Sequence, residues 1–159
     1  WVAAAASGVF TLEAMPAARD LWLIATGTAL GVYLSILRTP DPWERFQRIY
    51  LVHGVRSADE LTYGEVIGAL RDTHGDRFQF IPVFSRERRD GVLHGRIPPL
   101  LTAGELEGRA GAAIEADHSH LMLCGQAEMI KEVRAFLEAR GMRRHRRNEP
   151  GHYTTEQYH

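Results

Sequence analysis

The chain has 159 residues, of which 45% are hydrophobic and 25% charged, and its formal net charge at pH 7 is −1. This composition supports one ordinary core, and the balanced charge excludes a whole-molecule field that would attract nucleic acid or a membrane surface. A single cysteine, Cys124, excludes an internal disulfide and favours a reducing, cytoplasmic compartment, and no apolar run approaches the length of a membrane-spanning helix, about 18 residues.

The first half of the chain alternates apolar runs with helical patterns. Leu21–Ala25 and Ile49–Gly54 are continuous apolar runs, which are typical of strands buried on both faces. A helix that begins with Val32–Leu37 must end soon afterwards, because Pro40 follows. Apolar residues at helical spacing within Thr62–Asp72 predict an amphipathic helix.

The second half repeats this alternation. Phe78–Phe84 predicts a third strand, and the charged segment that follows it is interpreted as a loop. From Gly141 the tail is basic and then aromatic, with no clear period. The other predicted elements are a loop over Ser85–Gly95, a short helix over Ile97–Leu101, a buried strand over His120–Cys124 and a helix over Gln126–Arg140.

This alternation predicts a three-layer α/β fold, in which a parallel sheet of about five strands lies between helices. Ligands of such sheets bind beyond the carboxyl ends of the strands. Clusters of polar or small residues close four of the predicted elements: Thr26–Gly31, His53–Arg56, Ser85–Arg86 and Cys124–Gly125. We therefore expect a binding site at this edge of the sheet.

The turn Thr26–Gly31 joins the first buried strand to its helix. A helix start offers unpaired N–H groups and a partial positive charge, which together bind phosphate. Gly27 and Gly31 leave room for a ligand, and Thr26 and Thr28 supply hydroxyl groups. The spacing does not match the G-x-G-x-x-G fingerprint. The turn is a candidate phosphate site, with ordinary packing of small residues as the alternative.

Arginines follow the second and third strands. The second strand lacks the acid that would hold a ribose 2′-hydroxyl and ends at Arg56, which would attract a 2′-phosphate. Arg86 ends the third strand, and Arg96 follows the next loop. Because arginine matches phosphate oxygens bidentately, these three residues predict a phosphate clamp. The alternative is three solvated surface side chains.

Two further features bear on chemistry. Cys124 could touch a reacting ring, although a small buried hydrophobe is the favoured interpretation. His118 and His120 lie two residues apart, but two ligands without a partner carboxylate do not make a metal site. We therefore predict no metal.

The motifs LWLIATGTALGVYLSIL, LVHGVR, VFSRE, GRIP, HLMLCG and PGHYTTEQYH occur in the order seen in bacterial ferredoxin/flavodoxin–NADP⁺ reductases. The chain resembles this family over Gly8–Tyr158, most specifically in HGVR, SRE, GRIP and the aromatic tail. The resemblance implies a cytoplasmic, monomeric flavoprotein oxidoreductase with a ferredoxin reductase-like fold. It would pass hydride between NADPH and FAD and exchange single electrons with ferredoxin or flavodoxin.

The resemblance also implies a role for each site residue. The NADP pyrophosphate would lie on the turn that contains Thr26, Gly27, Thr28 and Gly31. The 2′-phosphate would be held by Arg56, Ser85, Arg86 and Arg96. The nicotinamide would lie near Cys124 and Gly125, with Glu156 in its proton environment, and the flavin ring would stack on Tyr158.

Such reductases carry an N-terminal flavin-binding barrel with an Arg-x-Tyr-Ser segment, which this sequence lacks. Gly8–Glu13 resembles the last strand of that barrel. Residues 1–15 are therefore interpreted as its remnant and residues 16–159 as the NADP-binding domain, which would be inactive without the flavin domain. The tail ends in Tyr158-His159 rather than the Tyr-Trp of close relatives, which weakens the predicted stacking. The alternative function is a stand-alone, non-catalytic NADP-binding or sensing module.

An arginine run precedes the tail. It is either a docking surface for an acidic electron carrier or a solvated basic helix end. An RNA-binding role is disfavoured, because the net charge is −1 and no aromatic residues are interleaved with these arginines. The run comprises Arg140, Arg143, Arg144, Arg146 and Arg147.

Overall fold

Parallel strands form the centre of the molecule. The computed structural model of the chain describes residues 18–146 and 148–158. Within them, one six-stranded sheet has the order β4-β3-β2-β1-β5-β6, and every neighbouring pair is parallel. The strands are β1 (Asp20–Thr26), β2 (Arg48–Val55), β3 (Phe78–Phe84), β4 (Leu93–His94), β5 (Ser119–Gln126) and β6 (Tyr153–Tyr158).

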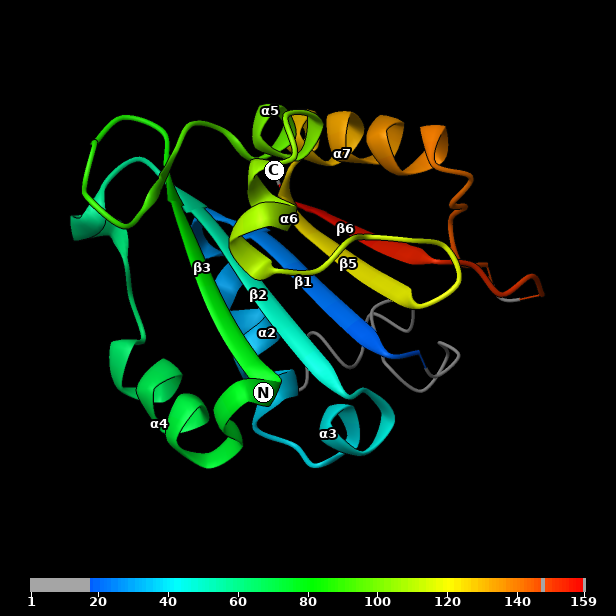
Figure 1. Cartoon of the computed structure of the whole chain (residues 1–159), viewed down its shortest axis with the longest axis horizontal. Coiled ribbons are helices and arrows are strands. Elements are labelled where there is room, and N and C mark those ends of the chain that lie inside the picture. Colours follow the sequence, from blue (N-terminus) through cyan, green and yellow to red (C-terminus); the bar gives the residue numbers. More distant parts are fainter. Residues whose placement is uncertain (1–17, 147, 159) are drawn as a thin grey trace.

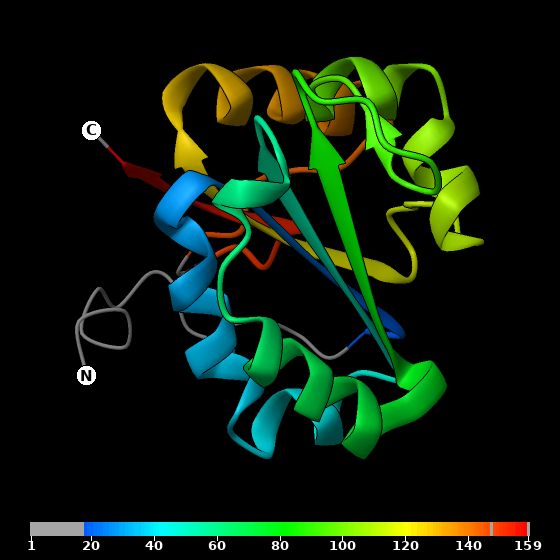
Figure 2. The same cartoon turned by 90° about the vertical axis from the view of Figure 1, so that its left-hand side faces the viewer.

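Helices cover both faces of this sheet, as Figures 1 and 2 show. One face carries α2 (Leu30–Leu37), α3 (Asp41–Arg45) and α4 (Gly64–His74). The other carries α5 (Ile97–Thr102), α6 (Glu105–Ala110) and α7 (Ala127–Ala139). Three short 3₁₀ turns complete the described elements: η2 (Gly27–Ala29), η3 (Ala58–Glu60) and η4 (Gly75–Arg77).

The sheet separates two hydrophobic cores. Successive side chains of a strand point to opposite faces. Leu21 and Leu23 therefore pack towards α2, whereas Trp22 and Ile24 pack towards α5 and α7, and all four are fully buried. This double burial explains why the central strands are continuous apolar runs in the sequence.

The predicted three-layer α/β fold is confirmed, with more elements than expected. Helices α3 and α6 were not predicted, and β4 lies inside the segment interpreted as a loop. Strand β6 forms from the tail that showed no period, because an edge strand needs only one paired neighbour, here β5. The strand predicted over Gly8–Glu13 lies outside the described residues. Among the described helices, none is long and apolar enough to cross a membrane.

Candidate functional site

The carboxyl ends of the parallel strands meet at one edge of the sheet, where a cleft of about 660 Å³ opens. Its walls come from the ends of β1, β2, β3 and β5, from the loop before α5, and from α7. Six predicted site residues line it: Thr26, Gly27, Arg56, Ser85, Arg86 and Arg96. Two other clefts among the described residues, of about 680 and 840 Å³, are lined by none of the predicted site residues.

Close backbone approach shapes the cleft where β1 and β5 end. Thr26 Oγ1 accepts a hydrogen bond from the backbone N–H of Gln126 at 3.1 Å. Gly125 has φ +140°, and a Cβ at this position would lie 2.0 Å from Thr26 Oγ1. The ends of the two strands can therefore meet only because residue 125 is glycine.

A buried histidine fixes the turn after β1. His53 is fully buried on β2, and its Nε2 lies 2.7 Å from the carbonyl oxygen of Gly27. Burial lowers the pKa of His53, so the ring is neutral at pH 7 and Nε2–H donates to that carbonyl. The sequence placed His53 in an edge cluster without giving it a role. The contact depends on the register of β1 and β2, which brings two distant residues together.

Thr28 and Gly31, the other predicted residues of this turn, do not line the cleft. Thr28 is exposed, and no side chain caps the first turn of α2 by a hydrogen bond. A Cβ on Gly31 would lie 3.3 Å from the hydroxyl oxygen of Tyr63. The space that Gly31 leaves is therefore taken by Tyr63 rather than open to a ligand. Tyr63 precedes α4 with φ +62° and is half exposed.

The three predicted clamp arginines reach the cleft in different states. Arg56 Nε and Nη2 donate to Glu60 Oε2 at 2.9 and 2.5 Å. The side chains of Arg86 and Arg96 are both exposed to solvent. Backbone hydrogen bonds from Ser85 to Val55 and from Arg86 to Arg56 tie the ends of β3 and β2 together. One arginine is thus paired inside the protein and two are solvated.

Glu60 lines the cleft, and the sequence did not reveal it. Turn η3 carries it back over Arg56, whose backbone N–H donates to Glu60 Oε1 at 2.7 Å. Hydrogen bonds from the side chain and backbone of Arg56, together with the charges of Arg56 and Arg86, lower the pKa of Glu60 to about 2. The only sign of this ion pair in the sequence is the spacing of four residues between Arg56 and Glu60. This spacing brings the two side chains together because the chain turns back through η3.

The predicted hydride-transfer residues lie on the neighbouring strands β5 and β6. Cys124 and Glu156 are paired in the β5–β6 register. The Cys124 side chain has no exposed surface and packs into the core beneath α2, whereas Glu156 is half-buried. The backbone of Tyr158 is paired with Gln126, but its side chain lies outside the described ones. These residues form a second group at the same edge, separated from Arg56 by β1.

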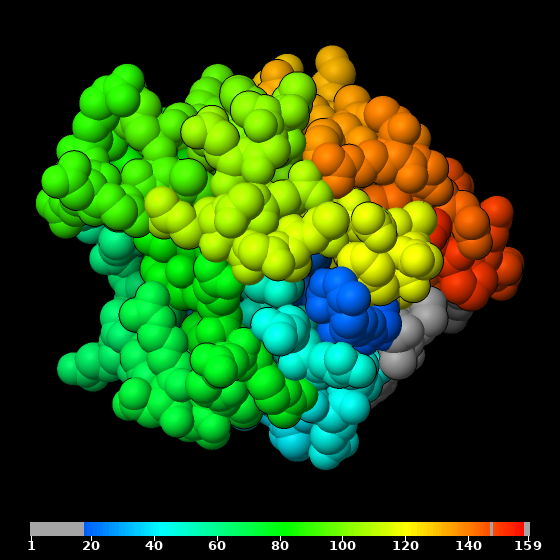
Figure 3. Space-filling view, viewed as in Figure 1, coloured from blue at the N-terminus to red at the C-terminus, as the bar shows by residue number. Residues whose placement is uncertain are grey.

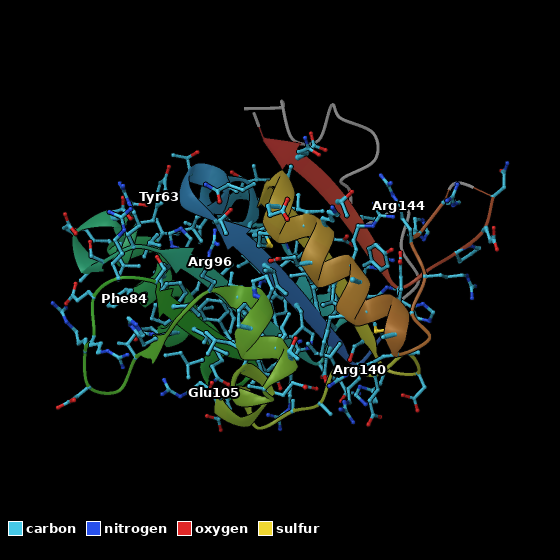
Figure 4. All side chains as sticks on the ribbon, turned by 90° about the horizontal axis from the view of Figure 1, so that it is seen from above. Tyr63, Phe84, Arg96, Glu105, Arg140 and Arg144 are labelled. Carbon is cyan, nitrogen blue, oxygen red and sulfur yellow. The ribbon has the colours of Figure 1, made fainter. Side chains whose placement is uncertain are left out.

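The arginine run lies at the opposite end of β6. Arg140 donates to Glu107 at 2.7 and 2.9 Å and lies 4.2 Å from the ring centre of Phe136. Arg143 Nη2 donates to the carbonyl of Pro150 at 2.6 Å. Figure 4 shows Arg144 at the far end of the strands from Arg96, and Figure 3 shows the orange-to-red chain well away from the green loop after β3. Arg147 lies outside the described residues.

The two histidines considered as metal ligands engage different partners. His118 Nε2 lies 3.0 Å from Glu115, and Nη2 of Arg19 lies 3.2 Å from His118 Nδ1. The ring of His120 stacks 6.5 Å from that of His152. Glu115, Asp117 and His118 offer ligand atoms within 4.8 Å of one another, carboxylates that the sequence argument did not consider. The cation Arg19 on the same imidazole disfavours a metal there.

Known proteins share the fold described above. Residues 23–135 match the family model of the oxidoreductase NAD-binding domain. The flavodoxin/ferredoxin–NADP reductase of Escherichia coli is 40% identical over 158 residues, which are 99% of this chain and 64% of that protein. The protein of the same name from Buchnera aphidicola (strain Bp) is 40% identical over 95% of this chain and 61% of its own length. This chain is therefore shorter than these relatives by more than a third of their length.

A solved structure is similar over the same region. A ferredoxin NADP⁺ reductase from Neisseria gonorrhoeae, with bound FAD and NADP, superposes with a TM-score of 0.85 at 31% identity. The match covers 92% of this chain and 59% of the Neisseria chain. The chain belongs to the oxidoreductase NAD-binding domain family, and it is similar to part of the ferredoxin/flavodoxin–NADP⁺ reductases.

Proposed function

We propose that this chain is the NADP(H)-binding part of a flavin-dependent ferredoxin/flavodoxin–NADP⁺ reductase. The observation that carries the proposal is the cleft at the carboxyl edge of the sheet, where Arg56, Arg86 and Arg96 meet. Three guanidinium groups in one cleft of this family suit a dianionic 2′-phosphate. The Neisseria reductase, which holds FAD and NADP, supports the assignment of both cofactors.

The residues of the cleft fit such a nucleotide. Its volume of about 660 Å³ is within the range of small-molecule sites. Arg86 and Arg96 are solvated and free to turn towards a phosphate, and Ser85 adds a hydroxyl beside them. Gly27 lines the cleft next to the uncapped start of α2, so the turn can donate backbone N–H groups to a pyrophosphate. Thr26, Thr28 and Gly31 belong to this turn in the proposal.

The chemistry belongs to the second group of residues. FAD, when bound, supplies the two-electron to one-electron conversion. This chain would orient the nicotinamide beside Cys124 and Gly125, with Glu156 next to Cys124 in register. The thiol is buried, so a ring could reach it only after the residues that cover it move. Tyr158, at the end of β6, is proposed to stack on the flavin.

The remaining proposals concern the parts beyond the cleft. Residues 1–15 are proposed to belong to the flavin-binding barrel and residues 16–159 to the NADP-binding domain. The names of the relatives support ferredoxin or flavodoxin as the electron carrier. A monomer in the cytoplasm completes the proposal.

A binding and reconstitution experiment tests this function. The 159-residue chain is titrated with NADP⁺ and NAD⁺ by calorimetry and mixed with FAD. We expect NADP⁺ to bind more tightly than NAD⁺ and FAD to be held weakly or not at all. The proposed longer protein, which would combine this chain with a flavin domain, should show a flavin spectrum and reduce dyes with NADPH. A full-length product without flavin that still bound NADP⁺ would support a sensing module instead.

A further inference from the structure

The end of β2 holds an acid as well as an arginine. Glu60 closes the 3₁₀ turn η3 and lines the same cleft as Arg56, Arg86 and Arg96. One of its oxygens, Oε1, accepts the backbone N–H of Arg56 at 2.7 Å, directly after the last residue of β2. Glu87 holds the turn from the other side by accepting the N–H of Ala58 at 2.9 Å. Glu60 is therefore held by a backbone N–H as well as by the side chain of Arg56.

The other oxygen, Oε2, is occupied by the guanidinium of Arg56. Nε and Nη2 donate to it at 2.9 and 2.5 Å. The carboxylate is ionised at neutral pH, and its hydrogen bonds with Arg56 help to lower the pKa of Glu60 to about 2. Removal of the Arg56 side chain would take both of these donors from Oε2 and leave the hydrogen bond from the backbone N–H to Oε1 in place, at a residue that lines the cleft.

A carboxylate in this place has a defined chemistry. In nucleotide-binding α/β sheets, an acid after the second strand accepts the hydroxyl groups of an unphosphorylated adenosine ribose, whereas an arginine there accommodates a 2′-phosphate. This cleft contains both groups, in contact with each other. We propose that Glu60 is a latent acceptor for the ribose of NAD(H), and that Arg56 sets the nucleotide preference by occupying it. This inference rests on the proposed function of the cleft.

The Arg56–Glu60 ion pair then discriminates between NADP⁺ and NAD⁺ by the group at the ribose 2′ position. A 2′-phosphate is a second anion for the Arg56 guanidinium, whose Nη1 edge is not bonded to Glu60. The 2′-hydroxyl of NAD⁺ would form only a weak hydrogen bond to Glu60, because Oε2 already accepts two hydrogen bonds from Arg56. Loss of Arg56 should therefore improve NAD⁺ binding as well as weaken NADP⁺ binding. Loss of Arg86, which is not hydrogen-bonded to Glu60, should weaken NADP⁺ binding without improving NAD⁺ binding.

The test measures dissociation constants of NADP⁺ and NAD⁺ for the 159-residue chain and three variants by calorimetry. In Arg56→Ala we expect NADP⁺ to bind at least tenfold more weakly and NAD⁺ about tenfold more tightly, since a hydrogen bond to a charged acceptor is worth about that factor or more. In Arg56→Ala combined with Glu60→Gln, the gain for NAD⁺ should disappear. Arg86→Ala is the matched control, with weaker NADP⁺ binding and unchanged NAD⁺ binding.

Two results would overturn the inference while leaving the proposed function in place. One is NAD⁺ binding in Arg56→Ala that is no tighter than in the parent chain. The other is an NAD⁺ gain that persists when Glu60 is also replaced. If the parent chain binds neither nucleotide, the proposed function itself fails. Circular dichroism checks that each variant folds, and Arg56→Met replaces Arg56→Ala if the alanine variant does not.

Discussion

Arginines gather in two regions of this molecule, and the regions differ in how they are assembled. Five arginines lie close together in the sequence between Arg140 and Arg147, yet Arg140 and Arg143 are used for internal contacts at the amino end of β6. Arg56, Arg86 and Arg96 are spread over 41 residues, but the parallel strands bring them to one cleft. Arginines that are close together in the sequence can therefore be used for internal contacts, whereas arginines that follow neighbouring parallel strands can meet in one binding cleft.

The largest expected effect tests the backbone that assembles the cleft. Gly125→Ala places a Cβ 2.0 Å from Thr26 Oγ1 and forces φ +140° on a residue that disfavours it. We expect a loss of about 3 kcal/mol in the free energy of unfolding, measured by urea denaturation. Gly68→Ala in α4 is the control, because nothing lies within 4 Å of that Cβ, and alanine there should stabilise the helix by up to about 1 kcal/mol. Equal effects of the two changes would contradict the close approach of β1 and β5.

The next effect separates the two arginine regions by nucleotide binding. Arg86→Ala should weaken NADP(H) by about 1.5–3 kcal/mol and leave NAD(H) nearly unchanged, because it removes charge-assisted hydrogen bonds to the 2′-phosphate. Arg144→Ala, at the other end of the strands, should change neither. The measurement is calorimetric titration of both nucleotides. Equal losses for NADP(H) and NAD(H) in Arg86→Ala would show that Arg86 does not recognise the 2′-phosphate.

A third substitution tests how much Arg140 contributes to the stability of the fold. Arg140→Ala removes two hydrogen bonds to Glu107, one to the carbonyl of Ile114 and the packing on Phe136, so we expect about 2 kcal/mol less stability in thermal unfolding. Arg144→Ala is the control, expected within about 0.5 kcal/mol of the parent. A stability loss of the same size in both variants would mean that the internal contacts of Arg140 add nothing.

The pH dependence of this third effect follows from Glu107. Burial raises the pKa of Glu107, but hydrogen bonds from Arg140 and from the N–H of Ile114 lower it, and the net direction is down. A lowered folded-state pKa contributes stability that is present above the unfolded value, about 4.3, and is lost as the pH falls through the folded value. The difference between Arg140→Ala and the parent should therefore be full at pH 7 and shrink below about pH 4. A difference that grew on acidification would exclude Glu107 as the partner that matters.

The smallest expected effect concerns docking of the electron carrier. In the proposed two-domain enzyme, reversing Arg143, Arg144 and Arg147 to Glu should slow ferredoxin or flavodoxin reduction several-fold at low salt, because surface charges act mainly on association. NADPH-to-dye turnover is the control and should stay near normal. Arg143 bonds to His152 and Arg144 pairs with Tyr153, so both lie at the amino end of β6, which makes this the weakest of the effects. Unchanged carrier reduction at low salt would assign the run to structure alone.

Much of the fold and part of the site could be predicted from the sequence, for a physical reason. Strands buried on both faces leave continuous apolar runs, so β1, β2, β3 and β5 were visible, and parallel strands share one carboxyl edge, so Arg56 and Arg86 could be brought together. Strand β6 was missed because its segment, Tyr153–Tyr158, is rich in polar residues and depends on pairing with β5. Interactions that depend on turn geometry could not be predicted from the sequence. Examples are the hydrogen bond from Arg56 to Glu60 and the contact of Tyr63 with Gly31.

The strand order divides the proposed nucleotide site into two parts, one on each side of β1. From β1 the chain winds one way through β2, β3 and β4, and then returns to build β5 and β6 on the other side. In the proposed assignment, the adenosine end of the nucleotide is recognised on the first side and the reactive ring is oriented on the second. Substitutions at Arg56 or Glu60 would then change which nucleotide is chosen without altering the hydride step. Cofactor preference and turnover could be tuned independently, by evolution or by design, on opposite sides of β1.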